Sequence, residues 1–93
     1  MHTDEKPLID VELFGIPRAR AGTARVAVCG ETLGAALVAL ASQYPALAAA
    51  CIEENRLRPG YLANLSGRRF ITDPATPLVS GDTLLILSAD AGG

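Results

Sequence analysis

The chain ends in Thr83-Leu84-Leu85-Ile86-Leu87-Ser88-Ala89-Asp90-Ala91-Gly92-Gly93, an apolar run followed by a small, glycine-terminated tail. Leucine and isoleucine fill the run, and the turn residues Ser80-Gly81-Asp82 precede it, which is typical of a buried strand. Beyond Ser88 the side chains are too small to pack into a core, so we expect a slender, flexible tail over residues 89–93. Five extended residues reach at most about 17 Å, which is enough to enter the active site of another protein.

Length and composition favour one small domain with an aliphatic core. The chain has 93 residues, 49% of them hydrophobic but only 4% aromatic, and a length of this order supports a single core. The net charge of −2 is dispersed, so there is no basic stripe for nucleic acid or for an anionic membrane. The longest apolar run, Leu33 to Ala41, is far shorter than the ~20 residues of a bilayer span, and Met1 to Lys6 lacks the apolar segment of a secretory signal. We therefore expect a cytoplasmic protein that binds neither nucleic acid nor membrane.

Side chains suited to catalysis or metal binding are few. Cys29 and Cys51 form neither a CxxC pair nor a metal-spaced cluster, and the single histidine, His2, lies in a leader over residues 1–7 that we expect to be disordered. No phosphate-binding GxxxxGK[ST] loop and no supported nucleophile–base arrangement is found. We therefore expect no catalytic residue, no metal and no bound cofactor, so that any chemistry at Gly93 has to come from another protein.

Alternating side chains predict the strands. From Leu8 to Phe14, residues Ile9, Val11 and Leu13 share one face, whereas Phe14 falls on the polar face, which predicts a strand with one buried side. We interpret residues 15–22 as a turn into a second strand over residues 23–29. Residues 61–65 and 68–72 predict two more strands joined by a turn, and residues 53–58 are expected at the surface. Before the last strand, Leu78 and Val79 are expected to tuck under the fold.

Helical spacing predicts one main helix between these strands. Thr32 fits an N-cap, and Leu33, Leu37, Leu40 and Tyr44 recur at helical spacing. Pro45 ends this helix and opens a shorter one, Pro45 to Ile52. The order of elements predicts an α+β domain over residues 8–88, in which a mixed sheet of four to five strands packs on one main helix plus the short helix. The first and last strands must then be parallel neighbours for the sheet to close around the main helix.

Several short motifs occur in a characteristic order along residues 8–93. They are Val11-Glu12-Leu13-Phe14-Gly15, Gly30-Glu31-Thr32-Leu33-Gly34, Thr76-Pro77-Leu78, Ser80-Gly81-Asp82 and the terminal Ala91-Gly92-Gly93. With the elements in the order given above, the chain resembles the sulfur carriers of the MoaD/ThiS family, which have the β-grasp fold of ubiquitin. The additional segment over residues 45–59 makes it more similar to the MoaD type, the small subunit of molybdopterin synthase, than to the ThiS type.

The resemblance implies that Gly93 is the residue that reacts. A C-terminal carboxylate has a pKa near ~3.5, so it is ionised at neutral pH, is a poor electrophile and needs activation. An E1-like enzyme would adenylate Gly93 with ATP, and a sulfur donor, such as a cysteine desulfurase or a rhodanese-like protein, would convert the acyl-adenylate into a thiocarboxylate. An acceptor enzyme, such as a molybdopterin-synthase large subunit, would then receive the sulfur. Gly92, Ala91 and Asp90 would guide insertion of the tail.

The parity of the last strand suggests where such partners dock. Leu84 and Ile86 fall on one face of the strand and Leu85 and Leu87 on the other. If the first pair joins the core, Leu85 and Leu87 lie beside Phe14 and form an apolar partner-binding patch next to the tail. In the alternative, the chain's own loops cover these side chains.

The same sequence features are compatible with two other functions. One is a ubiquitin-like modifier that is joined through Gly93 to lysines of target proteins. Lys6 is the single lysine, so lysine-linked chains of such a modifier have one available position, which disfavours a polymer-forming modifier. The other is a non-covalent β-grasp interaction module in which the Gly-Gly ending is incidental.

Overall fold

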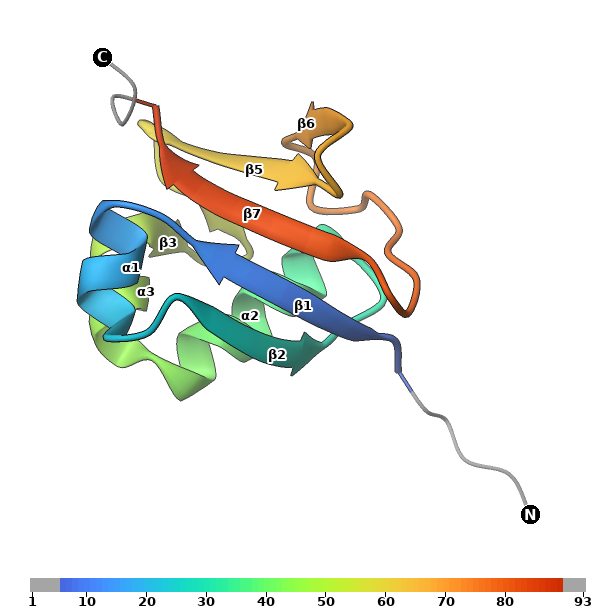
Figure 1. Ribbon diagram of the computed structural model, residues 1–93, viewed down its shortest axis with the longest axis horizontal. Coiled ribbons are helices and arrows are strands. Elements are labelled where there is room, and N and C mark those ends of the chain that lie inside the picture. Colours follow the sequence, from blue (N-terminus) through green and yellow to red (C-terminus); the bar gives the residue numbers. More distant parts are fainter. Residues whose placement is uncertain (1–5, 90–93) are drawn as a thin grey trace.

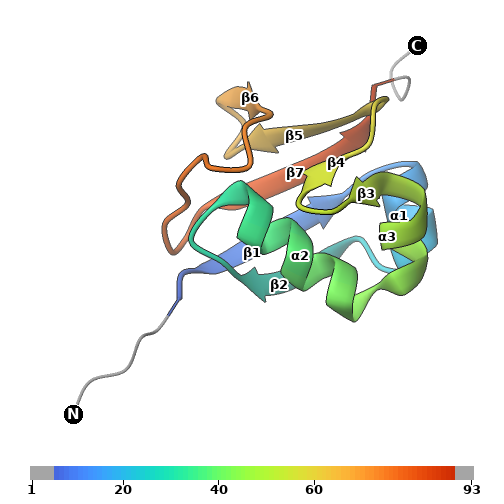
Figure 2. The ribbon, with the colours of Figure 1, turned by 180° about the vertical axis from the view of Figure 1, so that it is seen from behind.

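The computed structural model describes residues 6–89, which form a five-stranded mixed sheet with helices on one face (Figures 1 and 2). The strand order in the sheet is β2-β1-β7-β5-β6, and a separate two-stranded sheet pairs β3 with β4. The strands are β1 (Leu8–Leu13), β2 (Arg25–Cys29), β3 (Ile52–Glu53), β4 (Arg56–Leu57), β5 (Tyr61–Leu65), β6 (Arg69–Ile71) and β7 (Thr83–Ser88). The helices are α1 (Ile16–Ala21), α2 (Leu33–Gln43) and α3 (Pro45–Cys51).

The last strand, β7, lies at the centre of the sheet. It pairs in parallel with β1, where Val11 lies opposite Leu84 and Leu13 opposite Ile86, so the predicted parallel pairing is confirmed. On its other side β7 pairs antiparallel with β5, and β6 follows β5 at the edge. Because β7 runs in the same direction as β1, the two strands end at the same end of the sheet.

The core lies between the sheet and α2, which covers the sheet face seen in Figure 2. Alternate residues of β1 and β7 point into it, and Leu84 and Ile86 are both 0% exposed, as their parity predicts. Complete burial of an aliphatic side chain contributes about 1.5–3 kcal/mol relative to leaving it exposed, so these strands and α2 supply much of the stability. The largest fully buried aliphatic side chains of β1, α2 and β7 are those of Ile9, Val11, Leu13, Leu33, Leu37, Leu40, Leu84 and Ile86.

The start of α2 is fixed by a side-chain cap and by a close approach of two backbones. The Thr32 hydroxyl accepts a hydrogen bond from the Ala35 amide at 3.1 Å, as expected for an N-cap. A Cβ atom at Gly30 would lie 2.7 Å from the Ala36 backbone nitrogen, so only glycine lets the chain leave β2 so close to the helix. Close packing of β2 against α2 therefore explains the glycine that begins the motif over residues 30–34.

Residues 15–22 contain the helix α1 (Ile16–Ala21), so the prediction of a simple turn there is wrong. Gly15 has φ +64° before α1, and Gly22 ends it in the left-handed conformation with φ +78°, where its amide donates to the Arg18 carbonyl oxygen at 2.9 Å. Pro17 is the one fully buried side chain of α1. A helix of six residues without an apolar stripe has no helical periodicity in its sequence. The spacing of apolar residues therefore could not predict α1.

In the loop before β7, burial was predicted for two residues, and the structure confirms it for one of them. Leu78 is 3% exposed and packs in the core, as predicted. Val79 is 63% exposed, so its predicted burial is wrong. The Asp82 carboxylate accepts a hydrogen bond from the Val79 amide at 2.9 Å, and the turn that this bond closes leaves the valine side chain in solvent.

Candidate functional site

The C-terminal end of β7 leads into the segment of the chain that carries Gly93, the predicted reacting residue. Ser88, the last residue of β7, pairs with Tyr61, and the Ala89 amide donates to the Gly60 carbonyl oxygen at 2.7 Å. The chain is therefore bonded to β5 at Ser88 and to Gly60, the residue before β5, at Ala89. The predicted insertion and attachment residues Asp90, Ala91, Gly92 and Gly93 lie outside the described residues.

The sheet face opposite α2 is not covered by any described helix, and it faces the viewer in Figure 1. On this outer face, the row of side chains nearest the tail is apolar. Leu87 lies opposite Leu62 of β5, and Phe14, which follows Leu13, lies on its other side, with the Phe14 amide donating to the Ile86 carbonyl oxygen at 3.0 Å. Phe14 is 40% exposed, and both leucines are half-buried. Leu87 is thus placed beside Phe14.

The next row crosses all five strands of the sheet. From one edge to the other it contains Phe70, Asn64, Leu85, Glu12 and Arg25. Leu85 therefore has Asn64 and Glu12 as its direct neighbours, and Phe14 lies diagonally from it. Phe70 is 58% exposed.

We define the outer patch as the five apolar residues of these two rows. Sequence reasoning found three of its members and missed the two on β5 and β6, because cross-strand neighbours cannot be read from local alternation. For Phe70, the signal available in the sequence was the scarcity of aromatic residues, which makes an exposed ring informative. The outer patch consists of Phe14, Leu62, Phe70, Leu85 and Leu87.

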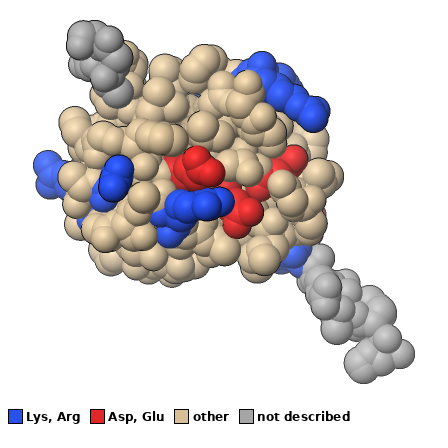
Figure 3. Space-filling view, viewed as in Figure 1, with Lys and Arg blue, Asp and Glu red and all other residues tan. Residues whose placement is uncertain are grey.

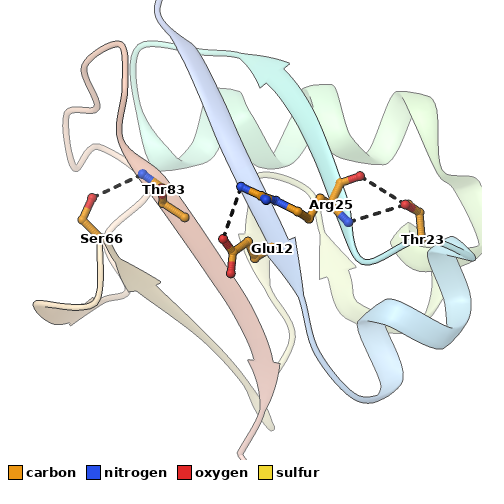
Figure 4. Close-up of polar contacts among 5 residues, drawn as sticks. All are labelled: Glu12, Thr23, Arg25, Ser66 and Thr83. Atoms are coloured by element: carbon orange, nitrogen blue, oxygen red, sulfur yellow. Dashed lines mark hydrogen bonds and ion pairs between the residues drawn. The ribbon is translucent and has the colours of Figure 1, made fainter.

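Charged side chains border the outer patch on β1 and β2. Glu12 and Arg25 form an ion pair at 3.6 Å across these strands, and Thr23 exchanges hydrogen bonds with the Arg25 backbone (Figure 4). Acidic side chains lie near the middle of this face in Figure 3. An exposed pair of this kind contributes at most about 1 kcal/mol to stability, so these charges are better suited to selecting partners than to holding the fold.

Asn64 is the one polar residue placed among the apolar side chains of the outer patch. Its Oδ1 atom is buried and has no hydrogen-bond partner among the described residues. A buried acceptor without a donor is costly, so Asn64 lowers the stability that this part of the sheet would otherwise have.

On the helix side of the sheet, the same end of the molecule contains a buried thiol. Cys51, at the end of α3, is 0% exposed and shares a hydrogen bond with Tyr61. Burial raises the pKa of the Cys51 thiol above its ordinary 9.0, while the Tyr61 hydrogen bond and the charges of Arg20 and Arg58 act in the opposite direction. Burial also raises the pKa of Tyr61. A buried thiol with a raised pKa is a poor nucleophile, so Cys51 acts in packing.

Residues 6–89 also contain a small cavity. A cavity of about 110 Å³ is lined by Leu33, Arg56, Leu57, Tyr61 and Thr72, which is too small for a nucleotide. No group of three or more metal-ligating side chains occurs in this part of the chain. Within the same residues, none of the helices has the length and apolar character needed to cross a membrane.

Solved structures of small proteins share this fold. SAMP1 from Haloferax volcanii matches 92% of this chain and 99% of its own, with a TM-score of 0.79 and 24% identity. The small archaeal modifier protein 1 from Methanosarcina acetivorans matches 95% of this chain and 98% of its own, with a TM-score of 0.77 and 25% identity. A chain of the Amycolatopsis orientalis BexX/CysO complex matches 91% and 99%, with a TM-score of 0.76 and 24% identity. No protein-family model and no curated protein matches the sequence.

These neighbours define the class of protein to which the fold belongs. The chain is a ubiquitin-like β-grasp protein, and the fold expected from the sequence is confirmed. The neighbours are consistent with the resemblance to the MoaD/ThiS family. Identities of 24–25% establish the common fold, and the activity has to be argued from the site.

Proposed function

We propose that this chain is a ubiquitin-like sulfur carrier whose C-terminal Gly93 is adenylated by an E1-like enzyme and converted to a thiocarboxylate. The observation that best supports the proposal is the position of β7. This strand lies at the sheet centre, ends at Ser88 and carries Leu85 and Leu87 of the outer patch. A partner that binds the outer patch is therefore already close to the start of the tail.

The chemistry at Gly93 divides between the chain and its partners. A carboxylate oxygen of Gly93 attacks the α-phosphate of ATP and pyrophosphate leaves, which gives an acyl-adenylate. The terminal sulfur of a persulfide on the donor's cysteine then attacks the acyl carbon and AMP leaves, which gives an acyl disulfide with the donor. A second thiol attacks the donor's sulfur in this disulfide, which releases the thiocarboxylate and leaves the donor cysteine in a disulfide with that thiol. The chain supplies the carboxylate and the docking surface, whereas an E1-like enzyme and a cysteine desulfurase or rhodanese-like donor supply the activation and the sulfur. Glycine at the last two positions minimises steric obstruction of the attacked carbonyl.

The acceptor of the sulfur is proposed from the resemblance to the MoaD type. The proposed acceptor is the large subunit of a molybdopterin-synthase-like enzyme or another biosynthetic enzyme of the cytoplasm. The solved complex of BexX with CysO supports docking of such a chain on a partner protein. The proposed docking surface is the outer patch around Phe14, Leu85 and Leu87.

A second function, attachment to proteins as a modifier, is favoured by the modifier names of two structural neighbours. It begins with the same adenylation of Gly93 and differs in the nucleophile, which is a lysine amine of a target protein. The two functions share the activated intermediate, so one assay tests their common step.

The common step is tested by ATP–pyrophosphate exchange with the E1-like enzyme of the native host. The full chain should support exchange, and a chain lacking Gly93 should reduce it to background. Val38→Asp serves as the matched control, because Val38 is 53% exposed on α2, away from the outer patch and β7. Undiminished exchange without Gly93 would show that this residue is not the one activated.

A further inference from the structure

The β5–β6 hairpin presents positive charge and an aromatic ring at an edge of the sheet. Arg68 and Arg69 are exposed, and the neighbouring Phe70 is 58% exposed. β6 pairs with β5 on one side and, within residues 6–89, with no strand on the other. Figure 3 shows Lys and Arg side chains gathered over this corner, apart from the acidic side chains at the middle of the face.

The charge of this hairpin is not neutralised by the residues that the structure describes. The ion pairs between these residues join Arg25 to Glu12 and Arg58 to Glu53, so neither hairpin arginine takes part in one. Asp73, the carboxylate that follows β6, instead accepts a hydrogen bond from the Ala75 amide at 2.9 Å. Two arginines are therefore available to an acidic partner.

The hairpin is held firmly against the central strand. The Arg68 amide donates to the Leu65 carbonyl oxygen at 2.9 Å, across a turn in which Ser66 and Gly67 have φ of 55° and 73°. Ser66 bonds β7 twice, through its amide to the Thr83 carbonyl oxygen at 2.7 Å and through its hydroxyl from the Thr83 amide at 3.3 Å (Figure 4 draws the second bond). A surface fixed in this way loses little conformational entropy when it binds.

We propose that the free edge of β6 is a docking site for an extended acidic segment of a partner protein, which pairs with β6 as an added strand. Main-chain hydrogen bonds would supply affinity and side chains would supply selectivity. Side chains alternate along β6, with Phe70 on the outer face and Arg69 on the face of the buried Ile71. The complementary segment therefore alternates apolar and acidic side chains.

This site is distinct from the tail. β5 and β7 are antiparallel with Leu65 opposite Leu84, so the hairpin turn lies at the end of β7 away from Ser88. Five residues of strand, about 17 Å, separate the two ends. The inference rests on the hairpin alone and does not require activation of Gly93.

A competing explanation is that the arginines only protect the sheet edge. Charges on a short edge strand discourage pairing between sheets, and β6 has three residues. That role does not account for Phe70, because an exposed aromatic ring on an edge strand promotes association. The two explanations differ in whether an acidic strand binds.

The test is a titration of the full, ¹⁵N-labelled chain with an eight-residue peptide of alternating glutamate and valine. We expect saturable shifts of the amide signals of Arg69, Phe70 and Ile71. The double variant Arg68→Glu with Arg69→Glu should bind at least about tenfold more weakly, which corresponds to about 1.4 kcal/mol. The control is Arg18→Glu with Arg20→Glu, which changes the net charge equally at exposed positions of α1 and should leave the affinity within about twofold.

Several results would overturn the proposal. They are no saturation at millimolar peptide, equal weakening by the two double variants, shifts centred on the outer patch near Phe14, or equal binding of a lysine–valine peptide of the same length. Arg68→Gln with Arg69→Gln repeats the test without adding negative charge. The ¹⁵N spectrum of each free variant shows whether it is folded, so a loss of affinity is separated from a loss of structure.

Discussion

The backbone of Phe14 is bonded to the sheet, while its side chain contributes to the exposed outer face. It follows β1 directly, and its amide is bonded to β7, yet 40% of its side chain remains in solvent. The alternation of Ile9, Val11 and Leu13 placed Phe14 on the outer face from sequence alone. What the sequence could not show is that Leu62 lies one strand beyond Leu87, because that neighbour depends on the pairing of β5 with β7.

Phe14→Asp should therefore weaken binding of the activating enzyme without unfolding the chain. A charge in the outer patch has to be desolvated on docking, so the dissociation constant should rise at least about tenfold. The free energy of unfolding should change by less than about 1 kcal/mol, because the side chain is already half in water. Titration calorimetry with the enzyme and urea unfolding of the free variant measure these two quantities.

Val38→Asp is the matched control for this substitution, since it adds the same charge to an exposed apolar position of α2. Its dissociation constant should equal that of the parent chain. If both variants bind equally well, the outer patch is not the docking surface. A large loss of stability in Phe14→Asp would instead assign Phe14 to the core.

At the scale of elements, the long periodic segments were predictable and the short ones were not. β1, β7 and α2 carry clear alternation or helical spacing, and their core-facing residues were assigned correctly. α1 was missed because two glycines bound a six-residue helix with one buried side chain. The β3–β4 hairpin was missed for a similar reason, since two-residue strands have no period.

The contact between α3 and β5 leads to a prediction about pH. The thiol of Cys51 is buried against Tyr61, and its pKa is raised in the folded chain. The unfolded chain therefore releases this proton at a lower pH than the folded chain, so stability is full below the ordinary thiol pKa of 9.0 and falls as the pH rises above it. Urea unfolding on both sides of that pH measures the decline.

Cys51→Ala should reduce this decline, although its absolute stability will be lower because of the cavity it creates. Cys29→Ala is the matched control, because it removes the exposed thiol and leaves the contact between Cys51 and Tyr61 in place. A decline that is the same in all three proteins would mean that another group is responsible. Tyr61, whose pKa is also raised, contributes in the same direction at higher pH.

Across the whole molecule, the sheet order takes the Phe14 end of the outer patch and the β5–β6 hairpin to opposite ends of the sheet, and Phe70 belongs to both surfaces. The parallel pairing of β1 with β7 brings Phe14 to the end where Ser88 closes the sheet, and the antiparallel pairing of β5 takes the Arg68–Arg69 hairpin to the other end. Element order and β7 parity predicted the first surface. The docking surface on the Arg68–Arg69 hairpin could not be predicted from the sequence. It was recognised from the exposure of Phe70 and from the absence of ion pairs for these two arginines among residues 6–89.

We propose that this domain presents its C-terminal glycine for chemistry that other proteins perform. Intact-mass analysis of the chain isolated from its native host, followed by sequencing of the C-terminal peptide, shows the chemical state of Gly93. We expect a fraction of molecules in which one sulfur replaces one oxygen at Gly93. A chain whose terminus is always an unmodified carboxylate, neither sulfur-loaded nor attached to another protein while the E1-like enzyme is active, would contradict it.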